Sequence, residues 1–255
     1  AGRFQLTQWA ERPMRHPHHS ASAVALVGGG SPPRPGEISL AHQGVLFLDE
    51  LPEFPRAALE ALREPLESGS VTISRAALTS EFPARFQLIA AMNPCPCGYA
   101  GQVSSVENRG PVCRCTPDQV RRYVSKISGP LLDRIDLHIE VPRQNTSLVV
   151  SAPEGEKTSV VRDRCLRAMK LARSRQGCCN QALSGALLTE HCALNETALA
   201  YLTQVATHFA WSARGTHRVL KVARTIADLA NCDAIDTDHI AEAVQYRRTI
   251  DERQH

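Results

Sequence analysis

One short segment constrains the fold of this chain more than any other: residues 44–50, which read Gly-Val-Leu-Phe-Leu-Asp-Glu. A continuous apolar run that ends in acids is typical of a strand buried on both faces of a parallel sheet. Parallel strands need long crossover connections, which are usually helices. The segment therefore predicts an α/β domain with Asp49 and Glu50 at the carboxyl end of an inner strand, where such sheets carry their chemistry.

Two more strands are predicted in the same half of the chain. Residues 86–92 form a second continuous apolar run, which ends at Asn93, and they predict another buried strand. Apolar and polar residues alternate over residues 135–141, which predicts a third strand. Together with the first segment, these runs are sufficient for a small parallel sheet.

Helices and a hairpin are predicted between the strands. Apolar spacing predicts a helix over residues 55–68, and Thr-Pro-Asp at residues 116–118 is typical of the start of another, which runs to about residue 127. Residues 71–79 have the composition of two short hairpin arms with Arg75 near the tip. The stretch up to about residue 42 contains too many prolines and glycines for a long element.

The second half of the chain is predicted to be helical. Residues 144–159 show no periodicity and are interpreted as a linker. The predicted helices beyond it cover residues 160–175, 196–209, 212–230 and 237–248. Strands with crossover helices, followed by helices alone, predict an α/β domain over residues 1–143 and an all-α domain over residues 160–255.

Composition limits the class of protein and its compartment. The chain has 255 residues, of which 43% are hydrophobic and 22% charged, so disordered and low-complexity classes are excluded. Its net charge of +3 is too small to identify a nucleic-acid partner by itself. Nine cysteines, without a signal peptide or an apolar run of membrane-spanning length, predict a protein of the reducing cytoplasm with no membrane partner.

The acids at the end of the first strand are the first candidate site. Asp49 is suited to hold Mg²⁺, and Glu50 to polarise an attacking water, as in nucleotide hydrolases. Asn93 follows the second strand and can orient the same water. The alternative interpretations are a solvated acidic turn and an ordinary Asn-Pro turn.

Two arginines farther along the chain are candidates for phosphate contacts. Arg134 directly precedes the third predicted strand and is placed to reach the γ-phosphate of a neighbouring subunit. Arg218 lies near the start of the helix over residues 212–230, which can fold over a nucleotide. The alternatives are a local Asp–Arg surface pair for Arg134 and a solvated helix face for Arg218.

A separate signal is a pair of Cys-x-Cys motifs. Four thiolates suit a tetrahedral structural Zn²⁺, although Cys-x-Cys is tighter than the usual Cys-x₂-Cys spacing. Free buried thiols and adventitious disulfides remain alternatives. The nearby run at residues 15–19, which contains His16, His18 and His19, is interpreted as a polar surface loop rather than a metal cluster. The four candidate zinc ligands are Cys95, Cys97, Cys113 and Cys115.

These sites, in this order, resemble the AAA+ ATPases of the magnesium-chelatase group, and most closely the YifB/ComM family. The segments that carry the resemblance are residues 12–19, 28–50, 51–67, 91–98, 128–143 and 212–229. The resemblance implies a partial P-loop NTPase core of the AAA+ type, a parallel sheet with helices, followed by an all-α lid domain. It also implies ATP and Mg²⁺ as cofactors and a homo-hexameric whole protein.

The resemblance further implies a role for each candidate residue. Asp49 and Glu50 match the Walker B acids, and Asn93 matches sensor 1. Arg134 matches the arginine finger, and Arg218 matches sensor 2. Arg214, one helical turn earlier, is the second candidate for sensor 2.

Arg75 lies in the predicted hairpin, which resembles a pre-sensor hairpin that contacts DNA in related motors. An ordinary exposed arginine is the equal alternative at this position.

One departure from the family pattern concerns the phosphate-binding loop. The motif G-x-x-x-x-G-K-[ST] does not occur, and Gly28-Gly29-Gly30 has no lysine. We therefore expect the chain to be a C-terminal fragment that begins inside the AAA+ core, binds ATP weakly and hydrolyses none. The alternative is a true pseudo-ATPase.

The resemblance implies a function for the whole protein: an ATP-driven DNA-remodelling motor, a helicase that promotes branch migration in natural transformation. Hydrolysis would take place between subunits, with branched or single-stranded DNA as the partner. The alternatives are the ATPase subunit of a magnesium chelatase, which metallates a tetrapyrrole, and a non-catalytic interaction module if the phosphate-binding loop is truly absent.

Overall fold

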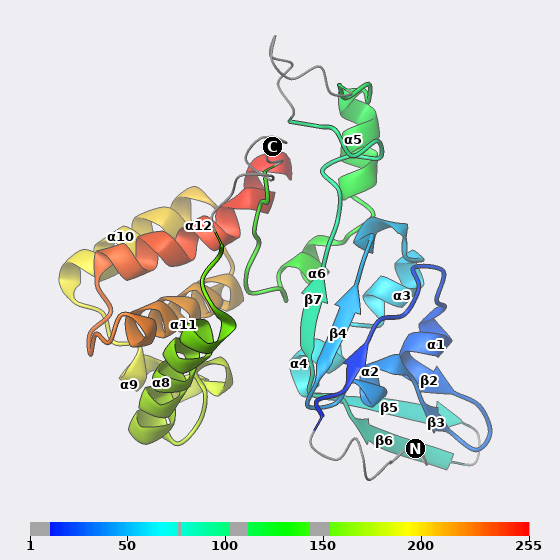
Figure 1. Ribbon diagram of the computed structural model, residues 1–255, viewed down its shortest axis with the longest axis horizontal. Helices are drawn as coiled ribbons and strands as arrows, with labels where there is room; N and C mark the ends of the chain where they lie inside the picture. The colour runs from blue at the N-terminus through cyan, green and yellow to red at the C-terminus, as the bar shows by residue number, and fades with distance from the viewer. Residues whose placement is uncertain (1–10, 76–77, 102–111, 143–153, 255) are drawn as a thin grey trace. The chain divides into compact units, whose positions relative to one another are not determined.

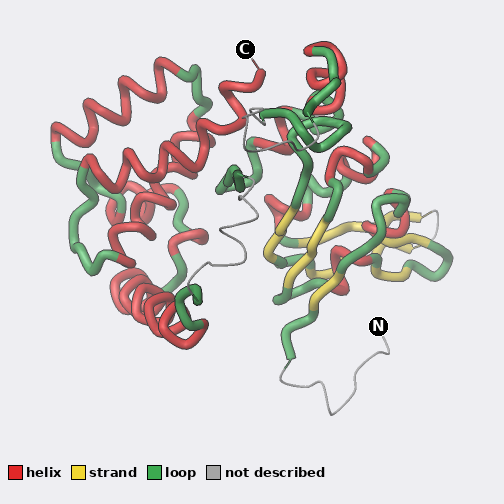
Figure 2. Tube along the Cα trace, turned by 45° about the horizontal axis from the view of Figure 1, so that its top comes forward, coloured by secondary structure: helices red, strands yellow, loops and turns green. Residues whose placement is uncertain are grey.

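The computed structural model describes residues 11–75, 78–101, 112–142 and 154–254. The chain divides into two compact units, Ala1–Ile135 and Asp136–His255. Figures 1 and 2 show the strands gathered in the first unit and helices alone in the second. The α/β class followed by an all-α region is confirmed. Most of the predicted linker lies outside the described residues, so its bounds stay a prediction.

The centre of the first unit is a three-stranded parallel sheet. Its strands are β1 (Met14–Arg15), β4 (Val45–Leu48) and β7 (Gln87–Ala90), in the order β1-β4-β7 (Figure 1). The middle strand buries Leu46 and Leu48 completely. The apolar run at residues 44–50 is therefore an inner strand, as predicted.

Two small antiparallel sheets and two short helices complete the N-terminal part. The helices α1 (Ala23–Val27) and α2 (Glu37–Leu40) are short, as the many prolines and glycines predict. The predicted hairpin is present as β5 (Ser70–Arg75) and β6 (Leu78–Pro83), with Val71 and Ile73 buried. The second pair, β2 (Gly28–Gly29) and β3 (Arg34–Pro35), contains two of the three consecutive glycines.

The single helix predicted over residues 55–68 is wrong. The structure has a short 3₁₀ turn, η2 (Leu51–Glu53), then α3 (Arg56–Glu60), and, after a turn, α4 (Pro65–Ser68). Pro65 is the cause, because proline lacks the N–H that a continuing helix needs and its ring clashes with the preceding turn. It is tolerated at the first position of α4.

The helix predicted from residue 116 is confirmed as α5 (Pro117–Val124). Thr116 and Gln119 form a reciprocal capping box, in which each side chain accepts a hydrogen bond from the backbone N–H of the other. A short helix, α6 (Gly129–Leu132), follows and buries Leu131 and Leu132.

The strand predicted over residues 135–141 is wrong: no strand is assigned there. Ile139 is 69% exposed and Val141 83% exposed, so the alternating apolar side chains face solvent. A strand is stable only with partners on a sheet, and no described segment pairs with this one. The strand β7 also differs from the buried strand expected, because Ile89 and Ala90 are exposed.

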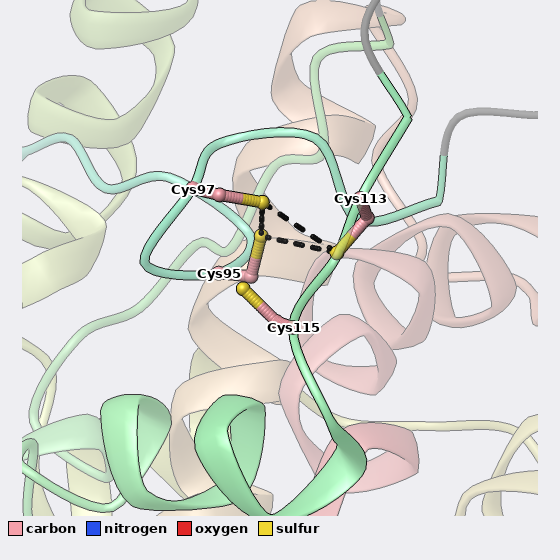
Figure 3. Close-up of side chains that lie close together, drawn as sticks. All are labelled: Cys95, Cys97, Cys113 and Cys115. Atoms are coloured by element: carbon pink, nitrogen blue, oxygen red, sulfur yellow. Dashed lines mark hydrogen bonds between the residues drawn. The ribbon is translucent and has the colours of Figure 1, made fainter.

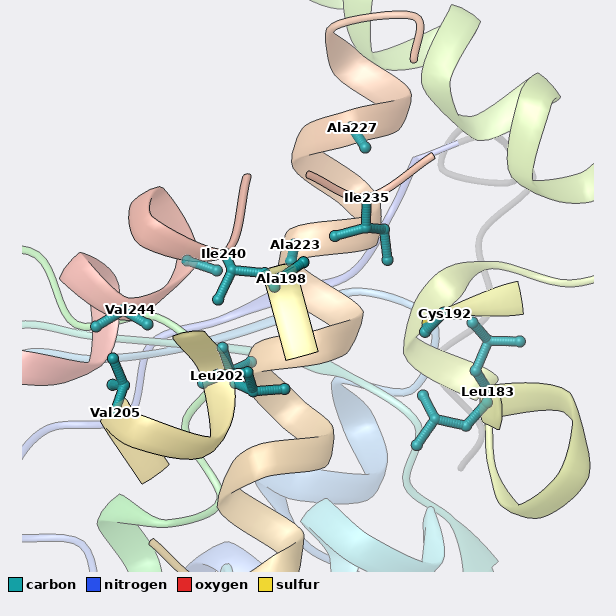
Figure 4. Packing of buried hydrophobic residues seen from close by; sticks show 13 residues of the cluster. Leu183, Cys192, Ala198, Leu202, Val205, Ala223, Ala227, Ile235, Ile240 and Val244 are labelled. Carbon is teal, nitrogen blue, oxygen red and sulfur yellow. The ribbon is translucent and has the colours of Figure 1, made fainter. Parts of the chain in front are cut away.

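The second unit contains all four helices predicted for it and one further α-helix. Its core is formed by buried side chains in or next to α9 (Gly185–His191), α10 (Glu196–His208), α11 (Ala213–Leu229) and α12 (Thr237–Gln254) (Figure 4). Among its buried side chains are Leu202, Ala223 and Ile240. The elements are α8 (Thr158–Gln176), η3 (Asn180–Ala182), α9 (Gly185–His191), α10 (Glu196–His208), α11 (Ala213–Leu229) and α12 (Thr237–Gln254).

A buried polar network joins three of these elements. Asp228 accepts hydrogen bonds from Arg175 at 2.7 Å, from Asn180 at 2.8 Å and from Arg224 at 3.2 Å. Arg224 also donates to the backbone carbonyls of Cys232 and Asp233. The network links α8, η3 and α11, and each of its charges has an opposite partner.

Among the described residues, no helix combines the length and apolar character that a membrane crossing requires.

Candidate functional site

The carboxyl edge of the sheet brings the candidate nucleotide-site residues to neighbouring strand ends. Leu48 is paired with Ala90, and the register continues past the strands, since the Leu51 N–H donates to the Ala91 carbonyl at 3.0 Å. Asp49 and Glu50 therefore leave β4 beside the segment that leads from β7 to Asn93. All three side chains are exposed rather than packed in the core.

Glu50 is held in an unusual conformation. Its backbone is left-handed, with φ of 52°, and its N–H donates to the Asp49 side chain at 2.9 Å. Non-glycine residues seldom adopt this conformation, and those that do concentrate at functional sites.

His19 is a site residue that the sequence analysis missed. Its Nδ1 lies 2.8 Å from the Glu50 carboxylate, and its ring lies against that of His18, with centroids 4.1 Å apart. It reaches the site because β1 runs parallel to β4, so the residues that follow both strands come to one edge. A two-residue strand has no detectable periodicity, so only the histidine run itself could have indicated the site.

Tyr123 is the second residue that was missed. It projects from α5, is only 5% exposed, and places its hydroxyl group against the backbone of Asn93. Burial and the nearby Glu53 carboxylate raise the pKa of Tyr123, and the hydrogen bond from Asn93 lowers it less than they raise it. Lys126 follows the same helix and binds Glu53 at 3.1 Å.

Arg134 is bound within its own chain. Its side chain is 10% exposed, and it donates to Glu67 of α4 at 2.6 Å and to the Pro130 carbonyl at 2.6 Å. Glu67, far away in the sequence, is thus one acid that pairs with it. Its predicted contact with a neighbouring subunit stays a prediction.

The two candidates for sensor 2 lie on α11 in the second unit. Arg218 is mostly buried and forms an ion pair with Asp136, and Arg214 is exposed one turn earlier. Their assignment to a nucleotide remains a prediction.

Arg75 is the candidate DNA contact, and it lies at the end of the hairpin strand β5. Arg75 closes the hairpin as the register partner of Leu78, as predicted for a residue near the tip. The structure does not describe the Arg75 side chain, so its contact with DNA stays a prediction. On α5, Arg121 is paired with Asp118, and after α5 Lys126 is paired with Glu53, so acids offset much of the positive charge there.

The four cysteines of the two Cys-x-Cys motifs converge, as Figure 3 shows. The Sγ atom of Cys95 lies 3.3 Å from that of Cys97 and 3.7 Å from that of Cys113, and Cys97 and Cys113 are 3.6 Å apart. All four Sγ atoms lie within 4.8 Å of one another, and all nine cysteines of the chain are free thiols. The disulfide alternative is therefore excluded in this structure.

Backbone groups also point at the sulfurs. The Ala100 N–H donates to Cys95 Sγ at 3.3 Å, and Gly98 has a left-handed φ of 80° that lets the chain turn back. A hydrogen bond from the backbone of Tyr99 is the largest of the effects that lower the pKa of the Cys97 thiol to about 6. A backbone hydrogen bond also lowers the pKa of Cys113 and of Cys115, but burial and the neighbouring thiols outweigh it and raise the pKa of both. The low pKa of Cys97 therefore belongs to a set of interacting thiols of which one ionises first.

Comparisons with known proteins agree with this architecture. The family model for "Magnesium chelatase, subunit ChlI" matches residues 2–149, and that for "Magnesium chelatase, subunit ChlI C-terminal" matches residues 155–247.

Curated relatives match nearly the whole chain. The competence protein ComM of Haemophilus influenzae is 48% identical over 243 residues, which cover 95% of this chain. The uncharacterized protein YifB is 47% identical in Salmonella typhimurium and 46% identical in Escherichia coli, each over 241 residues and 94% of this chain. The chain spans 46% of the length of each of these relatives. On these matches, the chain belongs to the magnesium chelatase ChlI family of AAA+ proteins.

Proposed function

We propose that these residues form part of the hydrolytic centre of an ATP-driven motor. In this proposal Asp49 holds Mg²⁺ through its water shell, Glu50 takes the proton from the attacking water, and Asn93 orients that water. The observation that carries the proposal is the register of β4 and β7, which brings the three exposed side chains to adjacent strand ends. The left-handed backbone of Glu50 also favours a functional turn at this position.

The cofactors in this proposal are ATP and Mg²⁺. When bound, Mg²⁺ neutralises charge on the phosphates, and carboxylates such as Asp49 are the oxygen ligands that it prefers. The chain has no G-x-x-x-x-G-K-[ST] motif and spans 46% of the length of its ComM relative, so we propose the activity for the whole protein and not for this chain alone. Titration calorimetry of the chain itself should show weak ATP binding, and tight binding would contradict this assignment.

Arg134 would act across a subunit interface in a homo-hexamer. Its ion pair with Glu67 and its bond to Pro130 hold the guanidinium within its own chain. Reaching a γ-phosphate in a neighbour requires exchange of the Glu67 carboxylate for the phosphate, which offers more charge and more acceptors. Arg218 on the helical unit would contact the nucleotide as sensor 2 in the same centre.

The test of the hydrolytic centre uses the whole protein. Glu50→Gln and Asn93→Ala should each lower kcat for ATP hydrolysis by at least about 100-fold. Glu81→Gln, an exposed glutamate on β6, is the matched control and should retain full activity. Full activity in Glu50→Gln would exclude the residue as the general base.

We further propose that the motor remodels DNA, as a branch-migration helicase in natural transformation. The support is the 48% identity to a competence protein, ComM, over 95% of this chain. ATP-dependent resolution of a branched DNA substrate by the whole protein is the expected result, and it should be lost in Glu50→Gln. The family match also keeps the chelatase ATPase as an alternative, which ATP-dependent insertion of Mg²⁺ into a porphyrin would favour.

Finally, we propose that the cysteine cluster of Cys95, Cys97, Cys113 and Cys115 holds a structural Zn²⁺. With Zn–S bonds near 2.3 Å, a tetrahedron places its sulfurs about 3.8 Å apart, close to the separations of 3.3–3.7 Å between the Sγ atoms of the first three. Elemental analysis of the purified chain should find one zinc ion per chain. Its absence after growth and purification with zinc would overturn this assignment.

A further inference from the structure

The cysteine cluster and the candidate water-orienting amide share one loop. Cys95 follows Asn93 by two residues and is fully buried. The loop then turns back at Gly98, where an added Cβ atom would lie 3.9 Å from both Cγ and Oδ1 of Asn93. The loop that contains the first Cys-x-Cys motif thus lies against the Asn93 side chain.

The other half of the cluster leads to the same amide by a second route. Cys115 is followed at once by Thr116, which caps α5. That helix carries Tyr123, whose buried hydroxyl group lies against the Asn93 backbone. Just beyond the helix, Lys126 binds Glu53, three residues after Glu50.

We call these two segments, residues 93–98 and residues 115–126, the arms of the cluster. Both lead to the candidate nucleotide site. We infer that a metal ion bound by the four cysteines positions Asn93, because it joins the loop wrapped on the Asn93 side chain to the helix packed on its backbone. The inference rests on the zinc and hydrolytic proposals made above. The cysteines and Tyr123 are positioning residues here, since none of them needs to touch the nucleotide.

Without the ion, the two arms are joined at the sulfurs by thiol contacts and by two backbone hydrogen bonds, from Arg114 to the Cys97 sulfur and from Cys97 to the Cys115 sulfur. Four metal–sulfur bonds fix the loop and the helix start relative to each other, as in small domains that fold only with their metal. The backbone of residues 91–98 should then open more often when the metal is removed. The helical unit, which has its own core, provides an internal reference.

The test is hydrogen exchange on the chain with and without zinc. Peptides covering residues 87–98 and 116–126 should exchange at least about fivefold more slowly with zinc bound, and peptides of α11 should be unchanged. Cys113→Ser with Cys115→Ser should lose both the metal and this protection. Cys165→Ser with Cys179→Ser, both exposed and outside the cluster, is the matched control and should keep both.

Tyr123→Phe separates positioning from folding. It leaves all four sulfurs, so zinc content and the tetrahedral thiolate spectrum of the Co²⁺ form should be retained, while exchange at residues 91–98 should rise. If zinc binds but exchange at these residues is the same with and without it, the positioning role is overturned and the zinc site stands. If no metal binds, both the positioning role and the zinc site are overturned.

Activity of the whole protein distinguishes this inference from the hydrolytic proposal. Cys113→Ser should lower kcat about tenfold and leave KM for ATP unchanged, since it displaces a group that acts in the chemical step. An active wild type with unchanged kcat in Cys113→Ser would overturn the inference alone. A wild type without ATPase activity would overturn the hydrolytic proposal instead.

Discussion

At the scale of single residues, the candidate general base, Glu50, already contacts another side chain. Glu50 is the proposed proton acceptor, but its carboxylate lies 2.8 Å from His19 Nδ1. For Glu50 to take a proton from the attacking water, as proposed, its carboxylate would have to exchange this contact with His19 for one with that water.

His19→Ala should raise basal ATP hydrolysis by the whole protein about two- to tenfold, because it frees the Glu50 carboxylate. Steady-state kinetics without DNA measures the effect. His18→Ala is the matched control, since the His18 ring bonds the Ser20 hydroxyl group instead. A fall in kcat for His19→Ala would show that the histidine holds Glu50 in its productive position instead.

Asp228 governs the stability of the helical unit. Burial raises the pKa of this carboxyl group, but hydrogen bonds from Arg175 and Asn180, together with the charge of Arg224, outweigh burial and lower it overall. Since the folded pKa lies below the unfolded value of about 3.9, the ionised group stabilises the fold above that value. The contribution is lost as the pH falls through the lowered folded pKa.

Asp228→Asn should therefore lower the free energy of unfolding of this unit by roughly 3–5 kcal/mol at pH 7, because it leaves the buried Arg224 and the partly buried Arg175 without this counter-ion. Urea denaturation monitored by helical circular dichroism measures the loss. Asp163→Asn, on the exposed face of α8, should change the stability by less than about 0.5 kcal/mol. The difference between wild type and Asp228→Asn should shrink as the pH falls from about 5 toward 2, and a constant difference would contradict the ionic explanation.

At the scale of elements, close backbone approach limits what the sheet accepts. Gly44 directly precedes β4, and an added Cβ atom would collide with the Pro13 carbonyl oxygen and lie 2.7 Å from Pro13 Cγ. The same carbonyl accepts the Val45 N–H at 2.8 Å. A side chain at Gly44 would therefore force β1 and β4 apart.

Gly44→Ala should destabilise the first unit by roughly 1–3 kcal/mol, the usual cost of forced displacement in a packed region. Hydrogen exchange of β4 and β7 peptides during urea titration provides the measurement. Gly129→Ala is the control, because no atom lies within 4 Å of its added Cβ. Equal effects of the two variants would show that the strand contact is not the cause.

At the scale of the whole molecule, each unit has its own stabilising interactions. The sheet buries Leu46 and Leu48, and the helical unit has a separate core around α11. We expect two unfolding transitions. In hydrogen exchange over a urea series, Gly44→Ala should shift only the transition of residues 11–135, and Asp228→Asn only that of residues 154–254. A single transition shifted by both variants would mean that the units unfold cooperatively.

The sequence alone determined the inner strand at residues 44–50, the strand after it and the four predicted long helices, because these depend on local apolar periodicity and caps. It also indicated the acids, Asn93 and the four cysteines by their places along the chain. The break at Pro65 was visible in the sequence too, but apolar spacing was given more weight.

Only the tertiary structure decided which residues meet. A strand as short as β1 is stable only through its pairing with β4, and that pairing brings His19 to Glu50. Tyr123 reaches Asn93 through the packing of α5, a contact without any local pattern. Residues 135–141 have the alternation of a strand yet form none in the described structure, because a strand depends on hydrogen bonds to a partner that its own sequence cannot supply.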